Sequence, residues 1–330
     1  MRLSDFDYQL PKELIAQYPL DKRDEAKLLV LDRAKNKIEH RIFKDLSDYL
    51  KKEDLLVLND TKVLAARLIG KRKTGGDVEI LLLERKEGLT FRALARPARV
   101  KIGEKIFFEN SEVSAQLSAK NEVIFDAQAE KEIYALGKMP LPPYIKREAE
   151  GKDNIYYQTV YAAYDGSVAA PTAGLHFTKE LLSDLKCGLA YITLHVGYST
   201  FKPVKAENIL EHSMEPEQFM VPEKTAQAIK KTNSNAGLEM GRIFAVGTTS
   251  CRALEAFAQG VKGGSTNLFI YPGYKFKLVN GLLTNFHLPK TTLFMLACAF
   301  GGIDLVKAAY AQAIEKQYRF YSYGDAMLIL

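Results

Sequence analysis

The sequence has few of the features that mark exported, membrane-bound or disulfide-rich proteins. Its 330 residues contain three cysteines, Cys187, Cys251 and Cys298, an odd number at wide spacings. Such a set fits reduced, buried thiols better than a disulfide framework or a zinc site. The first residues have no apolar core of signal-peptide length, and the longest apolar run, Leu293 to Phe300, is too short to cross a bilayer. We therefore expect a cytoplasmic chain without a membrane span.

The sequence also lacks a glycine-rich loop of the dinucleotide-binding or phosphate-binding type. A methyltransferase of the doubly wound type would carry a glycine-rich turn after its first strand, so the absence counts against that class. What is present is a globular composition, 47% hydrophobic and 26% charged, in a chain long enough for two domains.

Positive charge is concentrated in one stretch. Between Lys62 and Lys105 there are twelve lysines and arginines and five acidic residues, whereas the rest of the chain has 34 basic and 35 acidic residues. A localised basic patch is the electrostatic mark of a polyanion partner, although a solvated strand face can have the same composition. The distribution favours a nucleic acid as partner and assigns its contact to this stretch.

The order of predicted elements indicates an α/β domain interrupted by an all-β domain. Residues 27–31 and 38–43 predict a hairpin, 54–58 a buried strand, 190–195 and 242–246 further strands, and 250–258 and 303–317 helices. From about Leu64 to Val123 the pattern changes to short, closely spaced strands without helical period, typical of a barrel or sandwich. We predict a discontinuous, barrel-like α/β domain over 1–62 and 150–330, with a basic β-barrel domain inserted over 63–149.

Polar loops follow several of the predicted strands, where α/β folds place their ligands. One spans 164–178, is rich in small residues and ends at His176, and a second spans 192–201 and contains His195. A third, 211–217, is acidic. The segment 244–255 predicts a strand, a turn and a helix start, which together form a potential anion site. The last, 281–293, places His287 and Lys290 before an apolar helix.

Four of the five histidines, His176, His195, His212 and His287, lie in these loops. Their spacings match no local zinc signature, so we expect no metal. A metal-dependent hydrolase that uses the four histidines is one alternative. A non-catalytic module that binds nucleic acid is another, which the basic stretch supports and the polar loops do not.

Taken together, several segments resemble the S-adenosylmethionine:tRNA ribosyltransferase-isomerase family of queuosine biosynthesis. The fifteen residues 164–178 carry most of the resemblance, which covers nearly the whole chain. The other segments are 4–8, 58–63, 96–99, 139–145, 157–162 and 318–327. The sequence departs from the family pattern at Glu215, at Tyr198 and Ser199, at Asn280 and at Thr291.

The resemblance implies an α/β fold with an inserted β-barrel, as the pattern predicts. It implies transfer and isomerisation of the ribosyl group of S-adenosylmethionine onto the aminomethyl group of a 7-deazaguanine at the tRNA wobble position. Adenine and methionine are released, and the product carries an epoxycyclopentanediol side chain. The positive sulfonium acidifies the adjacent ribose carbon, so a positioned base must take its proton. The partner is tRNA, and we expect a monomer.

We assign roles to individual residues on this basis. Our candidates for catalysis are His176, His195, Asp60 and Glu211, with Glu215 as a further base to test. The predicted substrate-binding residues are Thr172, Gly174, Phe177, Thr200, Thr248, Thr249, Ser250, Arg252, Phe286, His287 and Lys290. Thr248, Thr249 and Ser250 are assigned to the methionyl carboxylate or a tRNA phosphate. The predicted tRNA contacts are Lys62, Arg67, Arg96, Arg99 and Lys101. We further predict that the loops at 172–178, 195–201, 247–252 and 285–291 converge on one cleft.

Overall fold

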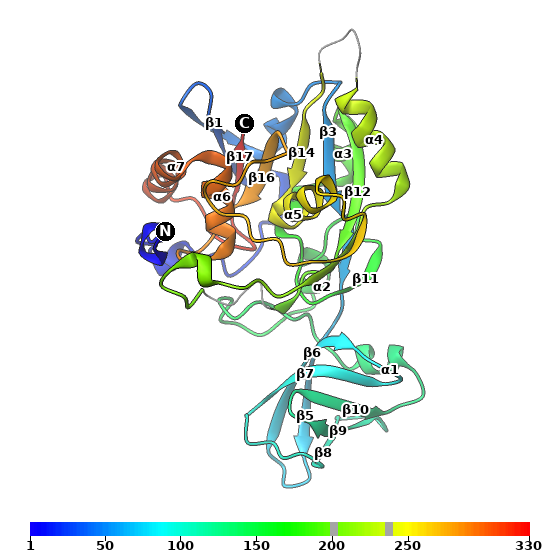
Figure 1. Ribbon diagram of the computed structural model, residues 1–330. Coiled ribbons are helices and arrows are strands. Elements are labelled where there is room, and N and C mark those ends of the chain that lie inside the picture. The colour runs from blue at the N-terminus through cyan, green and yellow to red at the C-terminus, as the bar shows by residue number, and fades with distance from the viewer. Residues whose placement is uncertain (199–203, 235–239) are drawn as a thin grey trace.

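The larger part of the chain forms one nine-stranded mixed sheet. In the computed structural model, which describes residues 1–198, 204–234 and 240–330, the strand order is β15-β13-β12-β3-β14-β16-β17-β1-β2 (Figure 1). In chain order these are β1 (Lys27–Asp32), β2 (Lys37–Ile42), β3 (Leu55–Asn59), β12 (Gly188–Leu194), β13 (Glu217–Met220), β14 (Ile243–Val246), β15 (Gly263–Thr266), β16 (Gly281–Asn285) and β17 (Ala326–Ile329). The central strands β12, β3, β14 and β16 run parallel, and β17 lies antiparallel to β16 and parallel to β1.

The expectation of a barrel-like main domain is wrong for the part of the chain that the structure describes. The sheet stays open, with β15 and β2 as its two outer strands. Sequence pattern shows that strands are buried, but not whether the first and last strand of a sheet meet. The predicted hairpin is confirmed, because β1 and β2 pair antiparallel from Lys27 opposite Ile42 to Asp32 opposite Lys37.

Both faces of the sheet are covered, which explains why its central strands are apolar throughout. In β3, Leu55 and Val57 pack into the core under the helices α5 (Gly247–Ala258), α6 (Thr292–Gly301) and α7 (Ile303–Glu315). Leu56 and Leu58 point into the opposite core, beside α3 (Lys179–Asp184) and the 3-10 segments η4 (Phe43–Tyr49) and η5 (Thr172–His176). Further helical segments of this part of the chain, among the described residues, are η1 (Leu3–Phe6), η2 (Lys12–Leu14), η3 (Arg23–Glu25), α2 (Asp153–Tyr156), η7 (Ile209–Glu211) and α4 (Glu223–Asn233).

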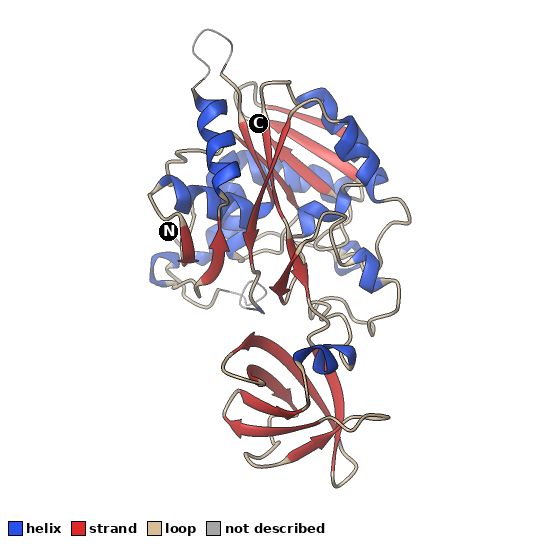
Figure 2. Ribbon diagram, turned by 90° about the vertical axis from the view of Figure 1, so that its right-hand side faces the viewer, coloured by secondary structure: helices blue, strands red, loops and turns tan. Residues whose placement is uncertain are grey.

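A closed six-stranded barrel lies beside the sheet, within the predicted insertion 63–149 (Figures 1 and 2). Its strands are β5 (Arg67–Arg72), β6 (Asp77–Arg85), β7 (Thr90–Arg96), β8 (Lys105–Phe107), β9 (Ser114–Ala119) and β10 (Glu122–Asp126), followed by α1 (Glu130–Ala135). Buried and exposed side chains alternate along its strands. In β7, for example, the buried Phe91 and Ala93 flank the exposed Arg92. The chain leaves the main body through β4 (Thr61–Val63) and re-enters through β11 (Tyr164–Ser167), which pairs parallel with β4.

Candidate active site

One cavity lies where the carboxyl ends of β12, β14 and β16 meet. Segments far apart in sequence line it: 169–173, Val196 after β12, 247–249 after β14, and 284, 285 and 287 at the end of β16. Tyr144, Leu293, Tyr321 and Ser322 complete the lining. The predicted convergence of the four loops is therefore confirmed for the described residues. We call this space the strand-end cavity.

The start of α5 forms one wall of the strand-end cavity. Gly247 has a φ of 88°, in the left-handed region that favours glycine, and turns the chain from β14 directly into the helix. Thr248 and Thr249 line the cavity, so hydroxyls and the free N–H groups of a helix N-terminus lie together there. The Asn59 carboxamide donates to Thr249 Oγ1 at 3.4 Å and to the Leu194 carbonyl at 2.9 Å, which ties this wall to β12.

A tyrosine pair forms another wall, and neither tyrosine is among the predicted site residues. The rings of Tyr144 and Tyr321 lie edge to face with centroids 3.8 Å apart, and the Tyr144 hydroxyl is hydrogen-bonded to Ser322 Oγ. Tyr321 has a φ of 75°, unusual for an aromatic residue, and its carbonyl accepts from Asn285 Nδ2 at 2.9 Å. Both residues lie in segments that carry the family resemblance, which was the available signal.

His287 is a neutral wall residue of the strand-end cavity. Its Nε2 is 2.8 Å from Thr284 Oγ1, and its backbone N–H donates to the Tyr310 hydroxyl at 3.0 Å. Burial lowers the pKa of His287 to about 3, so its ring is neutral at neutral pH. It can donate or accept a hydrogen bond in the cavity.

His176 lies behind the strand-end cavity and not in its lining. Its ring packs against Phe43, at a centroid distance of 4.9 Å, and burial lowers its pKa to about 4. Its buried Nε2 has no hydrogen-bond partner among the described residues, and the same holds for Oδ1 of the cavity residue Asn285. His176 lines a small separate pocket that also contains Arg23 and Ser322. Ser322 thus borders both spaces.

Three predicted residues lie near His176 in the sequence: Thr172 lines the cavity, and Gly174 and Phe177 have packing roles. Thr172 lines the strand-end cavity, and its contact with substrate stays a prediction. Gly174 does not line it: a Cβ on Gly174 would lie 2.1 Å from the Tyr161 hydroxyl, so the position requires glycine for packing. Phe177 is fully buried and packs edge to face on Phe43, outside the cavity lining, so its contact with substrate stays a prediction.

His195 and Asp60 form a second polar group, beside β4 and β11, outside the cavity lining. His195 Nδ1 is 2.8 Å from Thr61 Oγ1, and Asp60 Oδ1 accepts from Thr193 Oγ1 at 2.7 Å. Burial lowers the pKa of His195, which nearby Asp165 partly offsets, and burial raises the pKa of Asp60. Both shifts favour the neutral form. The half-buried His195 is therefore an unprotonated base at neutral pH.

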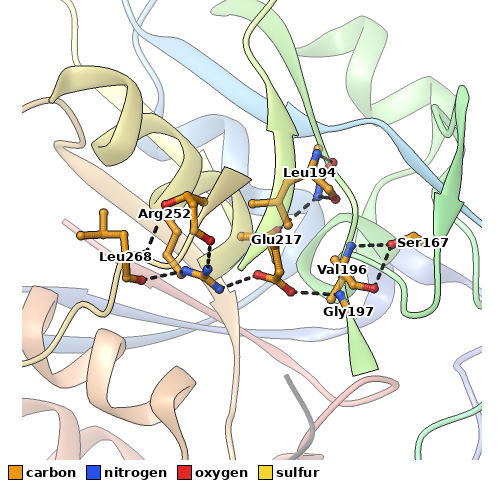
Figure 3. A network of polar contacts seen from close by, with 10 residues as sticks. Ser167, Leu194, Val196, Gly197, Glu217, Arg252 and Leu268 are labelled. Carbon is orange, nitrogen blue, oxygen red and sulfur yellow. Dashed lines mark hydrogen bonds and ion pairs between the residues drawn. The ribbon is translucent and has the colours of Figure 1, made fainter. Parts of the chain in front are cut away.

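Arg252 does not line the strand-end cavity, and its side chain is bound within the protein. Its contact with substrate stays a prediction. Its guanidinium pairs with Glu217 at 2.6 Å, with side chains 5% and 3% exposed, and Nε donates to the Leu268 carbonyl at 3.1 Å. Figure 3 shows the two side chains pointing toward one another between α5 and β13. Glu217 in turn accepts from the Gly197 N–H at 3.0 Å, so the pair fixes the turn after β12.

The structure places the other predicted residues outside the cavity lining. Phe286 is fully buried in an aromatic core with Tyr310 and Phe320, and this core packing explains its conspicuous place in the motif. Lys290 forms an ion pair with Asp7 at 2.6 Å. Glu211 is exposed in η7, where Asn208 donates to it at 3.4 Å. The site roles of these three residues stay predictions.

Two further predicted residues can be placed only in part. Ser250 is fully buried, its Oγ has no partner among the described residues, and it does not line the cavity. Thr200 lies outside the described residues, as does Ser199.

Half of the cations between Lys62 and Lys105 are already ion-paired. The six in pairs are Lys62 with Asp165, Arg67 with Glu79, Arg72 with Glu104, Arg85 with Glu130, Lys86 with Glu122, and Arg92 with Glu84. The other six, Lys71, Lys73, Arg96, Arg99, Lys101 and Lys105, form no side-chain ion pair with any residue that the structure describes. These six cations are the ones available to an anionic partner.

No group of three or more His, Cys, Asp or Glu side chains that could hold a metal ion occurs in the ranges 1–198, 204–234 and 240–330. In the same ranges no single helix has the length and apolar character needed to cross a membrane. The bent pair α6–α7, at 113°, meets that test only as a pair, by length and composition.

The arrangement defines an α/β enzyme with its ligand cavity at the carboxyl ends of parallel strands. The family profile described as "Queuosine biosynthesis protein" matches residues 3–329. The chain is 51% identical to the S-adenosylmethionine:tRNA ribosyltransferase-isomerase of Sulfurihydrogenibium sp. and 48% identical to the protein of that name from Caldanaerobacter subterraneus, with 100% of each chain covered. The crystal structure of S-adenosylmethionine tRNA ribosyltransferase from Thermotoga maritima is 38% identical, with a TM-score of 0.58 over 99% of this chain and 100% of that one. The chain therefore belongs to the S-adenosylmethionine:tRNA ribosyltransferase-isomerase family, the transferases of queuosine biosynthesis.

Proposed function

We propose that this chain transfers and isomerises the ribosyl group of S-adenosylmethionine onto 7-aminomethyl-7-deazaguanine at the wobble position of tRNA. The product is epoxyqueuosine-tRNA, and adenine and methionine leave. The observation that carries the proposal is the strand-end cavity, built by four separate loops of a chain whose full-length relatives bear this name. A tRNA-modifying enzyme acts where tRNA matures, so the proposal places the chain in the cytoplasm, as a monomer that needs no metal.

The start of α5 is the proposed site for the methionyl carboxylate. Thr248 and Thr249 offer hydroxyls, and the free N–H groups of the helix offer donors to an anion. The electron-rich faces of Tyr144 and Tyr321 are suited to the sulfonium or to a planar base. The proposed carboxylate site and the tyrosine pair thereby lie on different walls of the strand-end cavity.

Proton removal from the ribose carbon next to the sulfonium needs an unprotonated base. His195 meets the chemical requirement because burial lowers its pKa, and it is half-buried and hydrogen-bonded to Thr61. His176 meets it as well, since its pKa is lowered to about 4. Neither histidine lines the strand-end cavity in this conformation. If His195 is the base, the bound substrate must reach toward β4; if His176 is the base, Asn285 must relay the proton to it.

The reaction is tested by its leaving groups. Purified protein is incubated with S-adenosylmethionine and tRNA that carries the 7-aminomethyl-7-deazaguanine base, and small molecules and tRNA are analysed by mass spectrometry. Adenine, methionine and a wobble nucleoside of the mass of epoxyqueuosine are expected in equal amounts. Release of S-adenosylhomocysteine would instead show methyl transfer. Thr249→Val tests the carboxylate site: KM for S-adenosylmethionine should rise about tenfold, whereas Thr249→Ser keeps the hydroxyl and stays close to wild type.

A further inference from the structure

A second cleft lies between the barrel and the connector that leads from it back to the main body. The barrel contributes Arg67, Glu79 and Arg96, and the connector contributes Lys146, Arg147 and Glu148. We call it the junction cleft. On the barrel side its wall is regular, because Glu79 and Arg96 are opposite one another in the pairing of β6 with β7.

Most of the charges in the junction cleft are compensated inside the protein. Arg147 donates to both carboxylate oxygens of Asp153, at 2.7 and 2.8 Å. Glu148 pairs with Lys138 at 3.4 Å. These groups hold the connector in place and leave little charge for a ligand.

Two cations, one on each wall, form no ion pair with any described residue. Arg67 and Glu79 face one another at 4.0 Å. Arg96 is exposed on the barrel wall, and Lys146 is exposed on the connector wall, where its Nζ donates to the Pro143 carbonyl at 3.0 Å. A cleft with one such cation on the barrel side and one on the connector side suits an extended anion, and a phosphodiester backbone has that form.

The junction cleft is directly next to the strand-end cavity. Tyr144 lines the cavity and its chain neighbours Pro143 and Ile145 line the cleft, while Val196 lines the cavity and Tyr198 lines the cleft. Neighbouring residues are about 3.8 Å apart at Cα. One nucleotide can therefore place its base in one space and its phosphate in the other. Enzymes that act on an RNA base bind it splayed out of a single-stranded loop, which requires this kind of arrangement.

We propose that the junction cleft holds the RNA backbone beside the nucleotide whose base enters the strand-end cavity, with Arg96 and Lys146 contacting its phosphates from opposite walls. The proposal rests on the proposed function for the identity of the RNA. The cations of the basic stretch then have different roles. Arg96 contacts the reacting nucleotide, whereas Lys71 and Lys105, on the paired strands β5 and β8, do not border the cleft.

The first test measures tRNA affinity as a function of salt. Arg96→Gln and Lys146→Gln should each weaken binding about tenfold and lower the salt slope by about 0.7 for each lost phosphate contact. Lys71→Gln and Lys105→Gln are matched controls that remove an exposed barrel cation and should change affinity less than twofold. Equal losses in all four variants, or wild-type affinity in both cleft variants, would overturn the proposal. Adenine release by the wild type tests the proposed function separately.

The second test maps the contact without removing either cation. The native cysteines are at most 7% exposed, so Pro143→Cys provides a single reactive thiol in the cleft for a photo-crosslinker. Crosslinks to tRNA should fall on the nucleotides next to the wobble position, and Lys105→Cys should give none there. Crosslinks from Cys at 143 to the acceptor arm alone would refute the placement.

Discussion

Replacing Arg252 by Met tests whether this residue binds substrate or holds the cavity wall in place. The Arg252 and Glu217 side chains are 5% and 3% exposed and 2.6 Å apart. Removing one partner of a buried pair typically costs about 3–5 kcal/mol, because the other charge stays buried without compensation. The carbonyls of Leu268 and Thr266 also lose donors at 3.1 and 3.4 Å, while Gly197 keeps its bond to Glu217. We therefore expect the free energy of unfolding to fall by about 4 kcal/mol.

The assay is urea unfolding of the wild type, Arg252→Met, Glu217→Met and the double variant. Because two buried apolar side chains replace two buried charges in the double variant, it should recover most of the loss. The coupling free energy between the two positions should be about 3 kcal/mol. Lys22→Met is the control, since the Lys22–Glu25 pair is 72% and 54% exposed, so its loss should leave the urea midpoint close to that of the wild type.

The two roles of Arg252 give opposite results. A structural pair predicts lower stability and, at a temperature where the variant is folded, a KM for S-adenosylmethionine near that of the wild type. Wild-type stability together with a tenfold higher KM would refute the structural role and show that Arg252 contributes to substrate binding.

Three further predictions concern the site. In a single-turnover assay, His195→Ala should lower the rate of adenine release by about 10²–10⁴-fold, with tRNA affinity unchanged. A loss below tenfold would instead point to His176 as the base, which the same assay tests. Gly247→Ala should cost about 1–2 kcal/mol in urea unfolding, because a Cβ at a φ of 88° is strained, and should weaken S-adenosylmethionine binding in calorimetry; equal affinity would exclude the start of α5 as the carboxylate site. The pKa values of His176 and His287 are lowered to about 4 and about 3, so the unfolded chain binds more protons below pH 6.5. Stability should thus fall from pH 6.5 toward pH 4 by about 1.4 kcal/mol per pH unit for each histidine, and His287→Gln should show a shallower fall than the wild type; identical slopes would contradict the assignment.

The sequence predicts local elements and the meeting of loops well. Buried runs such as Leu55–Asn59 and alternating runs such as Thr90–Arg96 differ in period, so the main domain and the inserted barrel are distinguishable from the sequence alone. The rule that strand ends face the ligand crevice correctly predicts that the loops of Val196, Gly247 and His287 meet at one cavity.

What the sequence does not give is the direction in which each side chain points. Arg252 and Phe286 lie within site motifs, yet one is paired with Glu217 and the other is part of an aromatic core. Tyr144 and Tyr321 reach the cavity only because the connector and the C-terminal segment fold over it, and their one signal in the sequence is the family resemblance of the segments that contain them. Sheet closure likewise depends on long-range geometry, which explains the wrong expectation for the main domain.

The position of β17 governs how the molecule is assembled during synthesis. Ala326–Ile329 comes after every other strand in chain order, yet it joins β16 to β1 and thereby connects the β1–β2 hairpin to the rest of the sheet. The nascent chain on the ribosome must therefore keep β1 unpaired on that side while the barrel and all the parallel strands are made. A product cut short before Ala326 would consist of two separate sheet pieces with open edges, a species prone to aggregation. Only a chain made through Ile329 closes this gap, so synthesis of that strand is a condition for an intact cavity.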